Sequence, residues 1–329
     1  MKLHCRKSYL VSLLLLAFCA SVSAQSFVAT PLSDLKTGKY KGFLGGLYSN
    51  GSDLVPSDHS AAGLNFAAKV KPVNGKFVLL SIGMSNTKAE FKVFRQLARD
   101  NPNVNHTTLK VVNGAESGAD ACTWTVAFGS PQSAGCRNTS NQYDRVRDDL
   151  LDSLGLTEDQ VEVVWVKEAD VAPVIALPDS RADAFTYESY LGRIARAARQ
   201  RYRNLKLMFI SSRIYGGYAT TKLNPEPFAY ENGFAVKWAI QAQINQIRTG
   251  AIDAIAGDLN YTNGAAPWMV WGPYLWADGT KPRSDGLVWL RSDFGADGTH
   301  PSDAGATKVA TMLLNFFLTS PYTAWFRVR

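Results

Sequence analysis

The chain contains little cysteine and little histidine, with four residues of each among 329. Such a cysteine content excludes a small domain that depends on a disulfide framework, and a chain of this length can bury a large core without one. Two of the cysteines, Cys122 and Cys136, lie beyond the first 24 residues. No histidine motif accompanies either of them, so we expect neither to act as a catalytic thiol.

Long apolar runs and dense positive charge are also absent after residue 24. No later segment is long and apolar enough for a membrane helix, so we expect no stable membrane insertion. The formal charge of +7 includes three basic residues of the first 24 and falls to +4 without them. A charge this mild does not indicate nucleic-acid binding, which needs a concentrated basic face. The sequence has no internal repeat, and nothing in it indicates an obligate protein partner.

Residues 1–24 have the pattern of a secretory signal peptide. A positively charged start precedes a short apolar stretch, and Val22-Ser23-Ala24 fits the small-residue cleavage rule. We therefore expect cleavage near Ala24 and a secreted or periplasmic protein. Export places Cys122 and Cys136 in an oxidising compartment, where a disulfide would close a loop of about 15 residues and contribute about 3 kcal/mol. Two buried free thiols are the alternative.

Residues 25–75 are rich in glycine, serine, asparagine and proline without a clean period, which indicates an N-terminal extension packed on the core. Between residues 76 and 329, short apolar runs alternate with apolar residues at helical spacing. The predicted strands are 77–82, 108–112, 161–166, 205–211 and a short one near 268–271. The predicted helices are 87–100, 143–154, 187–202, 228–248 and 302–317. This alternation predicts an α/β fold, a three-layer α/β/α sandwich around a doubly wound parallel sheet.

A serine and an Asp–His pair stand at opposite ends of this alternation. Ser85 follows the first predicted strand on a tight turn before a helix, a position typical of nucleophiles. Asp297 and His300 lie one helical turn apart, so that His300 can take the serine proton while Asp297 orients the ring. The alternatives are a serine that only caps a helix and an incidental Asp-x-x-His. In parallel sheets ligands bind at the carboxyl ends of the strands, where the pattern also places 113–118 and 211–213.

Three blocks of residues resemble a known family. They are Ile82-Gly83-Met84-Ser85-Asn86, Asn113-Gly114-Ala115-Glu116-Ser117-Gly118 and Asp297-Gly298-Thr299-His300-Pro301-Ser302. The blocks resemble the first, second and fifth blocks of the SGNH (GDSL-like) hydrolase superfamily, in the variant with asparagine after the serine, as in sialate O-acetylesterase-like members. The resemblance spans residues 77–318 and implies a flavodoxin-like fold and ester hydrolysis without a metal or cofactor. It also implies an oxyanion hole built from the amides of Ser85 and Gly118.

The chain departs from the third block of this family. The resemblance implies Gly-x-Asn-Asp after the third strand, but the chain has Val166-Lys167-Glu168-Ala169-Asp170, with Ala169 in place of the asparagine donor. Losing one oxyanion donor costs on the order of 10²–10³ in rate. Asn86, Lys167 and Arg213 are candidates to replace that donor or to contact the substrate. The alternative is a catalytically weakened carbohydrate-binding or surface protein on the same fold.

Residues 267–289 are rich in tryptophan, and aromatic faces suit sugar rings. We therefore expect Trp276 and, from the N-terminal extension, Tyr48 to contact substrate, with an aromatic core under a long loop as the alternative. The whole sequence predicts a secreted serine esterase that acts on a small-molecule or glycan ester, with acetyl esters of carbohydrates as the first expectation. A lipase or thioesterase is the remaining alternative.

Overall fold

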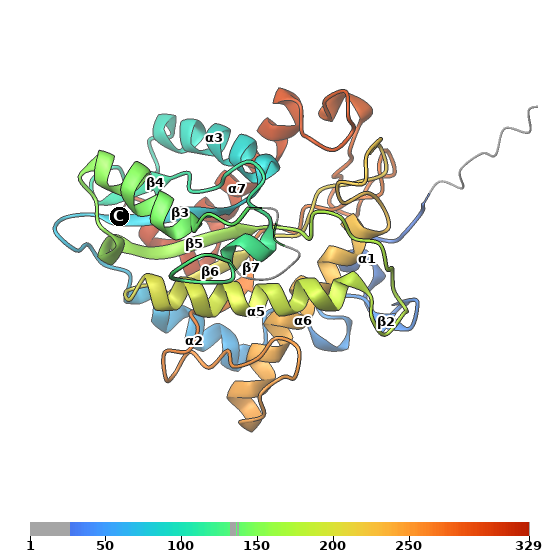
Figure 1. Cartoon of the computed structure of the whole chain (residues 1–329), viewed down its shortest axis with the longest axis horizontal. Helices are drawn as coiled ribbons and strands as arrows, with labels where there is room; N and C mark the ends of the chain where they lie inside the picture. The colour runs from blue at the N-terminus through green and yellow to red at the C-terminus, as the bar shows by residue number, and fades with distance from the viewer. Residues whose placement is uncertain (1–26, 132–135, 137, 329) are drawn as a thin grey trace, which may run out of the picture.

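The computed structural model of the chain describes residues 27–131, 136 and 138–328 (Figure 1). The predicted signal peptide lies outside these residues. No helix in the described part of the chain is both long and apolar enough to cross a membrane.

A parallel sheet of five strands forms the centre of the fold. The strands are β3 (Phe77–Gly83), β4 (Leu109–Val112), β5 (Val161–Lys167), β6 (Leu207–Ile210) and β7 (Trp268–Trp271). Their spatial order is β4-β3-β5-β6-β7, which is the flavodoxin-like order with the topological switch between β3 and β5. Every residue of β3 and β5 is buried, which explains their nearly continuous apolar sequences. The predicted doubly wound parallel sheet is confirmed.

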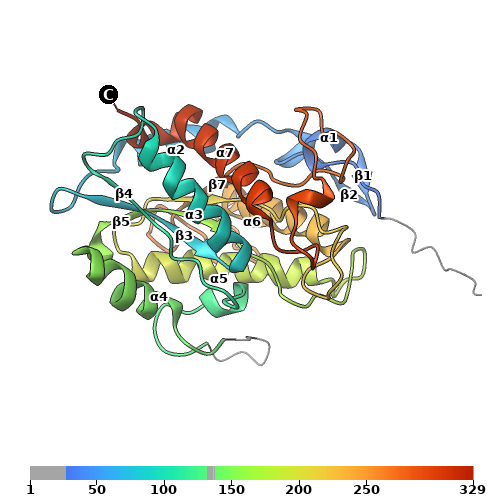
Figure 2. The same ribbon diagram turned by 90° about the horizontal axis from the view of Figure 1, so that it is seen from above.

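Helices cover both faces of the sheet (Figures 1 and 2). On one face, α3 (Ser85–Asp100) packs against α7 (Asp303–Thr319), and on the other α5 (Asp183–Arg201) packs against α6 (Phe228–Thr249). The α3 helix buries Phe91, Phe94 and Ala98 while Lys92 and Arg95 face solvent. Because each helix buries one apolar face against the strands, the result is the predicted three-layer α/β/α sandwich.

Residues 27–75 contain more regular structure than their sequence indicates. They form α1 (Leu32–Leu35), the short strands β1 (Lys39–Tyr40) and β2 (Phe43–Leu44), and the 12-residue helix α2 (Ser57–Ala68). The helix was not predicted because its buried residues, His59, Gly63 and Ala67, include no large apolar side chain and so produce no apolar period. A Cβ at Gly63 would lie 2.1 Å from the Trp268 ring, so the glycine lets α2 approach β7 closely.

The predicted helix over 143–154 is irregular. It begins as α4 (Gln142–Arg145) and continues as a π-helical turn over Val146–Leu151 and a 3₁₀ turn over Asp152–Leu154. Gly155 ends it in a left-handed conformation, with φ of 65°.

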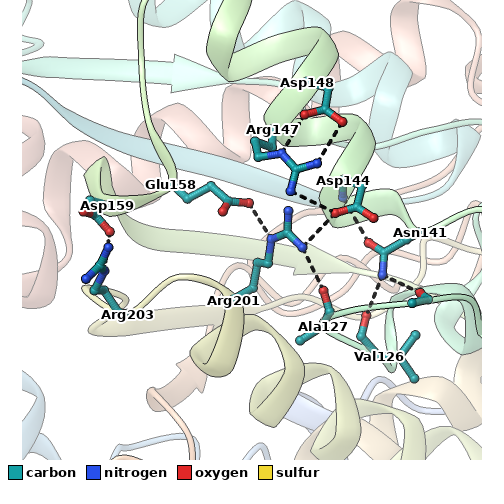
Figure 3. Close-up of polar contacts among 11 residues, drawn as sticks. Val126, Ala127, Asn141, Asp144, Arg147, Asp148, Glu158, Asp159, Arg201 and Arg203 are labelled. Atoms are coloured by element: carbon teal, nitrogen blue, oxygen red, sulfur yellow. Dashed lines mark hydrogen bonds and ion pairs between the residues drawn. The ribbon is translucent and has the colours of Figure 1, made fainter.

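The loop before α4 carries the predicted disulfide and is held on α5 by a buried arginine (Figure 3). Cys122 and Cys136 are joined, with Cα atoms 5.2 Å apart. The Arg201 side chain, only 1% exposed, pairs with Asp144 at 2.8 Å and also with Glu158. It donates a 3.1 Å hydrogen bond to the carbonyl of Ala127, inside the disulfide loop. The guanidinium of Arg201 therefore connects α5 to the disulfide loop, to α4 and to the turn before β5.

Candidate active site

The turn between β3 and α3 places Ser85 at the carboxyl end of a central strand. Strand β3 ends at Gly83, Met84 lies in extended conformation, and α3 begins at Ser85. A Cβ at Gly83 would lie 2.4 Å from the side chain of Thr87, so only glycine fits this tight turn. The Thr87 hydroxyl donates to the Lys167 carbonyl at 2.5 Å, which ties the first turn of α3 to the end of β5.

Ser85, His300 and Asp297 form one chain of hydrogen bonds. The distance between Ser85 Oγ and His300 Nε2 is 2.8 Å, and the distance between His300 Nδ1 and Asp297 Oδ2 is 2.5 Å. Asp297 Oδ1 accepts the backbone amides of Thr299 at 3.0 Å and His300 at 3.1 Å. The structure thus brings together the three side chains that sequence analysis assigned as nucleophile, base and orienting carboxylate.

A tight loop before α7 holds Asp297 and His300 in place. Gly298 has φ of 66°, and a Cβ there would lie 1.8 Å from the carbonyl oxygen of Tyr218. The amide of Thr220 donates to the Asp297 carbonyl at 2.9 Å. The segment after β6 therefore clamps the loop from outside, and glycine is needed at position 298 for both conformation and space.

Asn86 connects this loop to the nucleophile's helix. Its side chain is 2% exposed, and Nδ2 donates to the Thr299 carbonyl at 2.9 Å. From the sequence, Asn86 was expected to contact substrate or to serve as an oxyanion donor. One N–H of this amide is used for the bond to Thr299, so Asn86 links the His300 loop to the first turn of α3, and its role toward substrate or oxyanion stays a prediction.

The electrostatics of the pair favour an ionised Asp297. Burial opposes ionisation, but hydrogen bonds from the His300 ring and from the Thr299 and His300 amides outweigh it and lower the pKa of Asp297 below its ordinary value. The His300 side chain is 42% exposed and that of Asp297 32% exposed. The catalytic candidates therefore face solvent, where a substrate can reach them.

The second family-like block lies against the end of β3. A Cβ at Gly114 would lie 2.6 Å from the carbonyl oxygen of Ser81, and the amide of Glu116 donates to the Gly83 carbonyl at 2.9 Å. Gly118 ends this block with φ of 78° and is exposed. No atom lies within 4 Å of a Cβ built at Gly118, so the space beside its Cα is open.

Four other residues that were predicted to contact substrate have buried side chains. Their exposed fractions are 2% for Lys167, 4% for Arg213, 3% for Tyr48 and 0% for Trp276. Trp276 Nε1 donates to Glu226 at 2.7 Å, and the other tryptophans of 267–289 are buried as well. The structure favours the aromatic core over a sugar-stacking surface, because these rings are buried against other aromatic side chains, as Trp268 is against Tyr322 and Trp276 against Tyr230.

Lys167 illustrates what the sequence alone missed. Its Nζ lies 2.7 Å from each carboxylate oxygen of Glu90, and both side chains are almost fully buried. Burial lowers the pKa of Lys167 to about 8, while Glu90 opposes that shift. The ammonium group of Lys167 therefore pairs with a carboxylate of α3 inside the protein and is not directed to solvent. The only signal for this pair was a glutamate on the buried side of α3.

The position of the missing asparagine donor is apolar. Ala169 is 0% exposed and packs with Met84 and Val171. Its side chain offers no hydrogen-bond donor, so the departure from the third family-like block persists in three dimensions. In the described residues, no three histidine, cysteine or carboxylate side chains are grouped to hold a metal ion.

Comparisons with known proteins add little to this geometry. No family model matches the chain. No curated protein matches it either. Among solved structures, a gut microbial diltiazem-metabolizing enzyme is 12% identical with a TM-score of 0.36, over 75% of this chain and 48% of that one. A carbohydrate esterase family 2 enzyme with a carbohydrate-binding domain, from Corynascus thermopiles (Myceliophthora fergusii), is 13% identical with a TM-score of 0.36, over 73% of this chain and 65% of that one. Likenesses this distant carry no argument about function, which therefore rests on the site itself.

Proposed function

We propose that the protein is a secreted serine esterase in which Ser85 is the nucleophile, His300 the general base and acid, and Asp297 the orienting carboxylate. The observation that carries this proposal is the continuous hydrogen-bond chain from Ser85 Oγ through the His300 ring to Asp297. A serine hydroxyl becomes nucleophilic when such a base takes its proton.

The reaction follows from the tautomer that this chain favours. Asp297 accepts a hydrogen bond from the protonated Nδ1 of His300, which leaves the lone pair of Nε2 directed at Ser85 Oγ. His300 takes the serine proton as Oγ attacks the ester carbonyl carbon, and then returns it to the departing alcohol. A water molecule, deprotonated by His300 in turn, attacks the acyl-enzyme and releases the carboxylic acid and free Ser85.

The developing oxyanion lies at the N-terminus of α3. A 16-residue helix directs its first backbone amides and the positive end of its dipole toward this point. We assign the amides of Ser85 and Gly118 as oxyanion donors. Because Ala169 supplies no third donor, we expect a lower rate than that of an esterase with a complete oxyanion hole, by on the order of 10²–10³.

The open position of the triad favours a substrate presented on a large molecule. The side chains of His300 and Asp297 are each about one third or more exposed, which suits an ester displayed along a glycan better than a lipid that must be enclosed. We therefore assign acetyl esters of carbohydrates as the substrate class. Buried tryptophans do not contribute to this assignment.

The test is hydrolysis of p-nitrophenyl acetate and of longer acyl esters by the mature protein. We expect Ser85→Ala and His300→Ala each to lower kcat by at least about 10⁴-fold. Ser57→Ala, which changes an exposed serine at the start of α2, serves as the matched control for Ser85→Ala. Turnover that survives in Ser85→Ala contradicts the proposal. A folded wild type without turnover supports the alternative of a carbohydrate-binding protein, which the apolar Ala169 site already motivates.

A further inference from the structure

A groove lies along α3 from the middle of the helix to its C-terminal end, between the outward face of α3 and the edge of the sheet. Its volume is about 630 Å³. Lys92, Arg95 and Arg99 line it from α3, and His106 and Lys110 line it from β4 and the preceding loop. Strand β4 is the outermost strand on this side of the sheet. Cationic side chains from two elements therefore face one hollow.

The positive charge of this groove is largely uncompensated. Lys92, Arg95, Arg99 and Lys110 are all exposed. Among the described residues, neither Lys92, Arg95 nor Lys110 takes part in an ion pair. Arg99 has Asp100 at 3.4 Å, and both of those side chains are more than half exposed. Three cations without counter-ions at one concave surface attract an anionic ligand.

The groove shares a helix face with the proposed nucleophile. At 100° per residue, Ser85, Lys92 and Arg99 project from α3 within about 40° of one another. At 1.5 Å per residue, Lys92 lies about 10 Å and Arg99 about 21 Å from Ser85 along the helix axis. Lys88, between them, is neutralised by Glu116 at 2.7 Å, so the unpaired charge begins one turn beyond it.

We propose that this groove binds an anionic polysaccharide, whose carboxylate or sulfate groups contact Lys92, Arg95 and Lys110 while an ester further along the same polysaccharide reaches Ser85. The inference rests on the proposed esterase function and specifies its substrate class as an acidic glycan. The groove holds the polymer along α3, and the triad acts at the N-terminal end of the same helix.

Two other anionic polymers fit the groove less well. Single-stranded nucleic acid needs aromatic rings for base stacking, and no Phe, Tyr or Trp is present among the described residues that line the groove. An acidic peptide would add a strand to β4, but this edge has only four residues and carries Lys110, a device that discourages strand pairing. The backbone of Asn103 and Asn105, just before β4, already pairs with Val328 and Phe326.

The binding test compares dextran with its carboxymethylated and sulfated derivatives, which share a backbone and differ in charge. We expect the wild type to bind both charged polymers at 50 mM NaCl, to lose that binding at 300 mM NaCl, and to ignore neutral dextran. Exposed charge contacts each contribute about two- to fivefold in affinity, so the combined variant Lys92→Gln, Arg95→Gln, Lys110→Gln should weaken binding by about tenfold or more.

A control with the same change in net charge separates the groove from general electrostatics. Lys39→Gln, Lys69→Gln and Lys281→Gln together remove three exposed lysines on other parts of the surface. We expect this variant to bind within twofold of the wild type. Equal weakening in both variants, tight binding of neutral dextran, or preferential binding of single-stranded DNA or poly-glutamate would each overturn the proposal.

A turnover test connects the groove to the triad. Release of acetate is measured from acetylated carboxymethyl-dextran and from p-nitrophenyl acetate. We expect the groove variant to raise KM for the charged polymer about tenfold with little change in kcat, and to hydrolyse p-nitrophenyl acetate like the wild type. An unchanged KM for the polymer contradicts the proposal. If neither ester is hydrolysed by the wild type, the esterase function fails, whereas the binding experiment still tests the groove by itself.

Discussion

Replacement of Asp297 by asparagine tests the proposed site most sharply, because it changes one atom and reverses one hydrogen bond. In the wild type, Oδ1 accepts hydrogen bonds from the amides of Thr299 and His300 at 3.0 and 3.1 Å, and Oδ2 accepts one from His300 Nδ1 at 2.5 Å. In the variant, the carboxamide oxygen must remain on the two amides because only an oxygen can accept from them. Its NH₂ group then faces His300 Nδ1 and donates to it.

The consequence is the wrong histidine tautomer. Once Nδ1 accepts, the ring carries its proton on Nε2, which faces Ser85 Oγ at 2.8 Å and can no longer take the serine proton. We expect kcat to fall by about 10⁴-fold, equivalent to about 5.5 kcal/mol of activation free energy. The change is nearly isosteric and the site partly exposed, so the melting temperature should move by only a few degrees.

The assay is kcat and KM for p-nitrophenyl acetate between pH 7 and 9, with a thermal melt of each protein. Asp303→Asn, at an exposed aspartate that begins α7, is the matched control and should retain wild-type kcat. A kcat for Asp297→Asn within tenfold of the wild type would mean that Asp297 does not determine the tautomer of His300, contrary to the expectation.

Three further changes have expected outcomes. Gly298→Ala puts a Cβ 1.8 Å from the Tyr218 carbonyl, so the esterase kcat should fall more than tenfold. The control is Gly286→Ala, at φ of 84° with open space around the Cβ, which should lose only about 1–2 kcal/mol of stability in urea unfolding and keep its activity. Burial lowers the pKa of His59 to about 4 from 6.5, so its contribution to the free energy of unfolding is full above pH 6.5 and falls as the pH drops toward 4. The wild type should therefore lose about 2 kcal/mol more stability than His59→Gln between pH 8 and pH 5, and an equal loss in both proteins would contradict this. Cys136→Ser opens a loop of 14 residues and should lower the free energy of unfolding by about 3 kcal/mol, and a melt equal to that of the reduced wild type would support the assignment.

Much of the fold was predictable because most strands and helices are marked by a pattern within their own residues. The apolar runs of β3 and β5 and the helical spacing of α3 are local patterns, and their alternation requires a parallel sheet covered on both faces. The helix α2 escaped prediction because small and polar residues face the core there. Its burial depends on Trp268, a partner about 200 residues away that no local pattern reveals.

The triad residues were recognisable because their chemistry is tied to local turns, whereas the contact residues were not. Ser85 stands on a strand–helix turn, and Asp297 and His300 are near each other in sequence. Whether a cation such as Lys167 meets solvent or a buried Glu90 depends on which face of the sheet end it occupies. Lys167 was expected to contact substrate, but it is buried against Glu90.

From the sequence alone, the alternation of strands and helices after residue 76 and the candidate nucleophile, base and carboxylate could be predicted, because each is marked by a local pattern or turn. Only the tertiary structure decided the 2.8 Å contact between Ser85 and His300, the burial of the predicted substrate contacts, and the meeting of Lys92, Arg95 and Lys110 at one groove. The physical reason is that burial and pairing of charged groups are properties of surfaces from several elements, and no single segment encodes them.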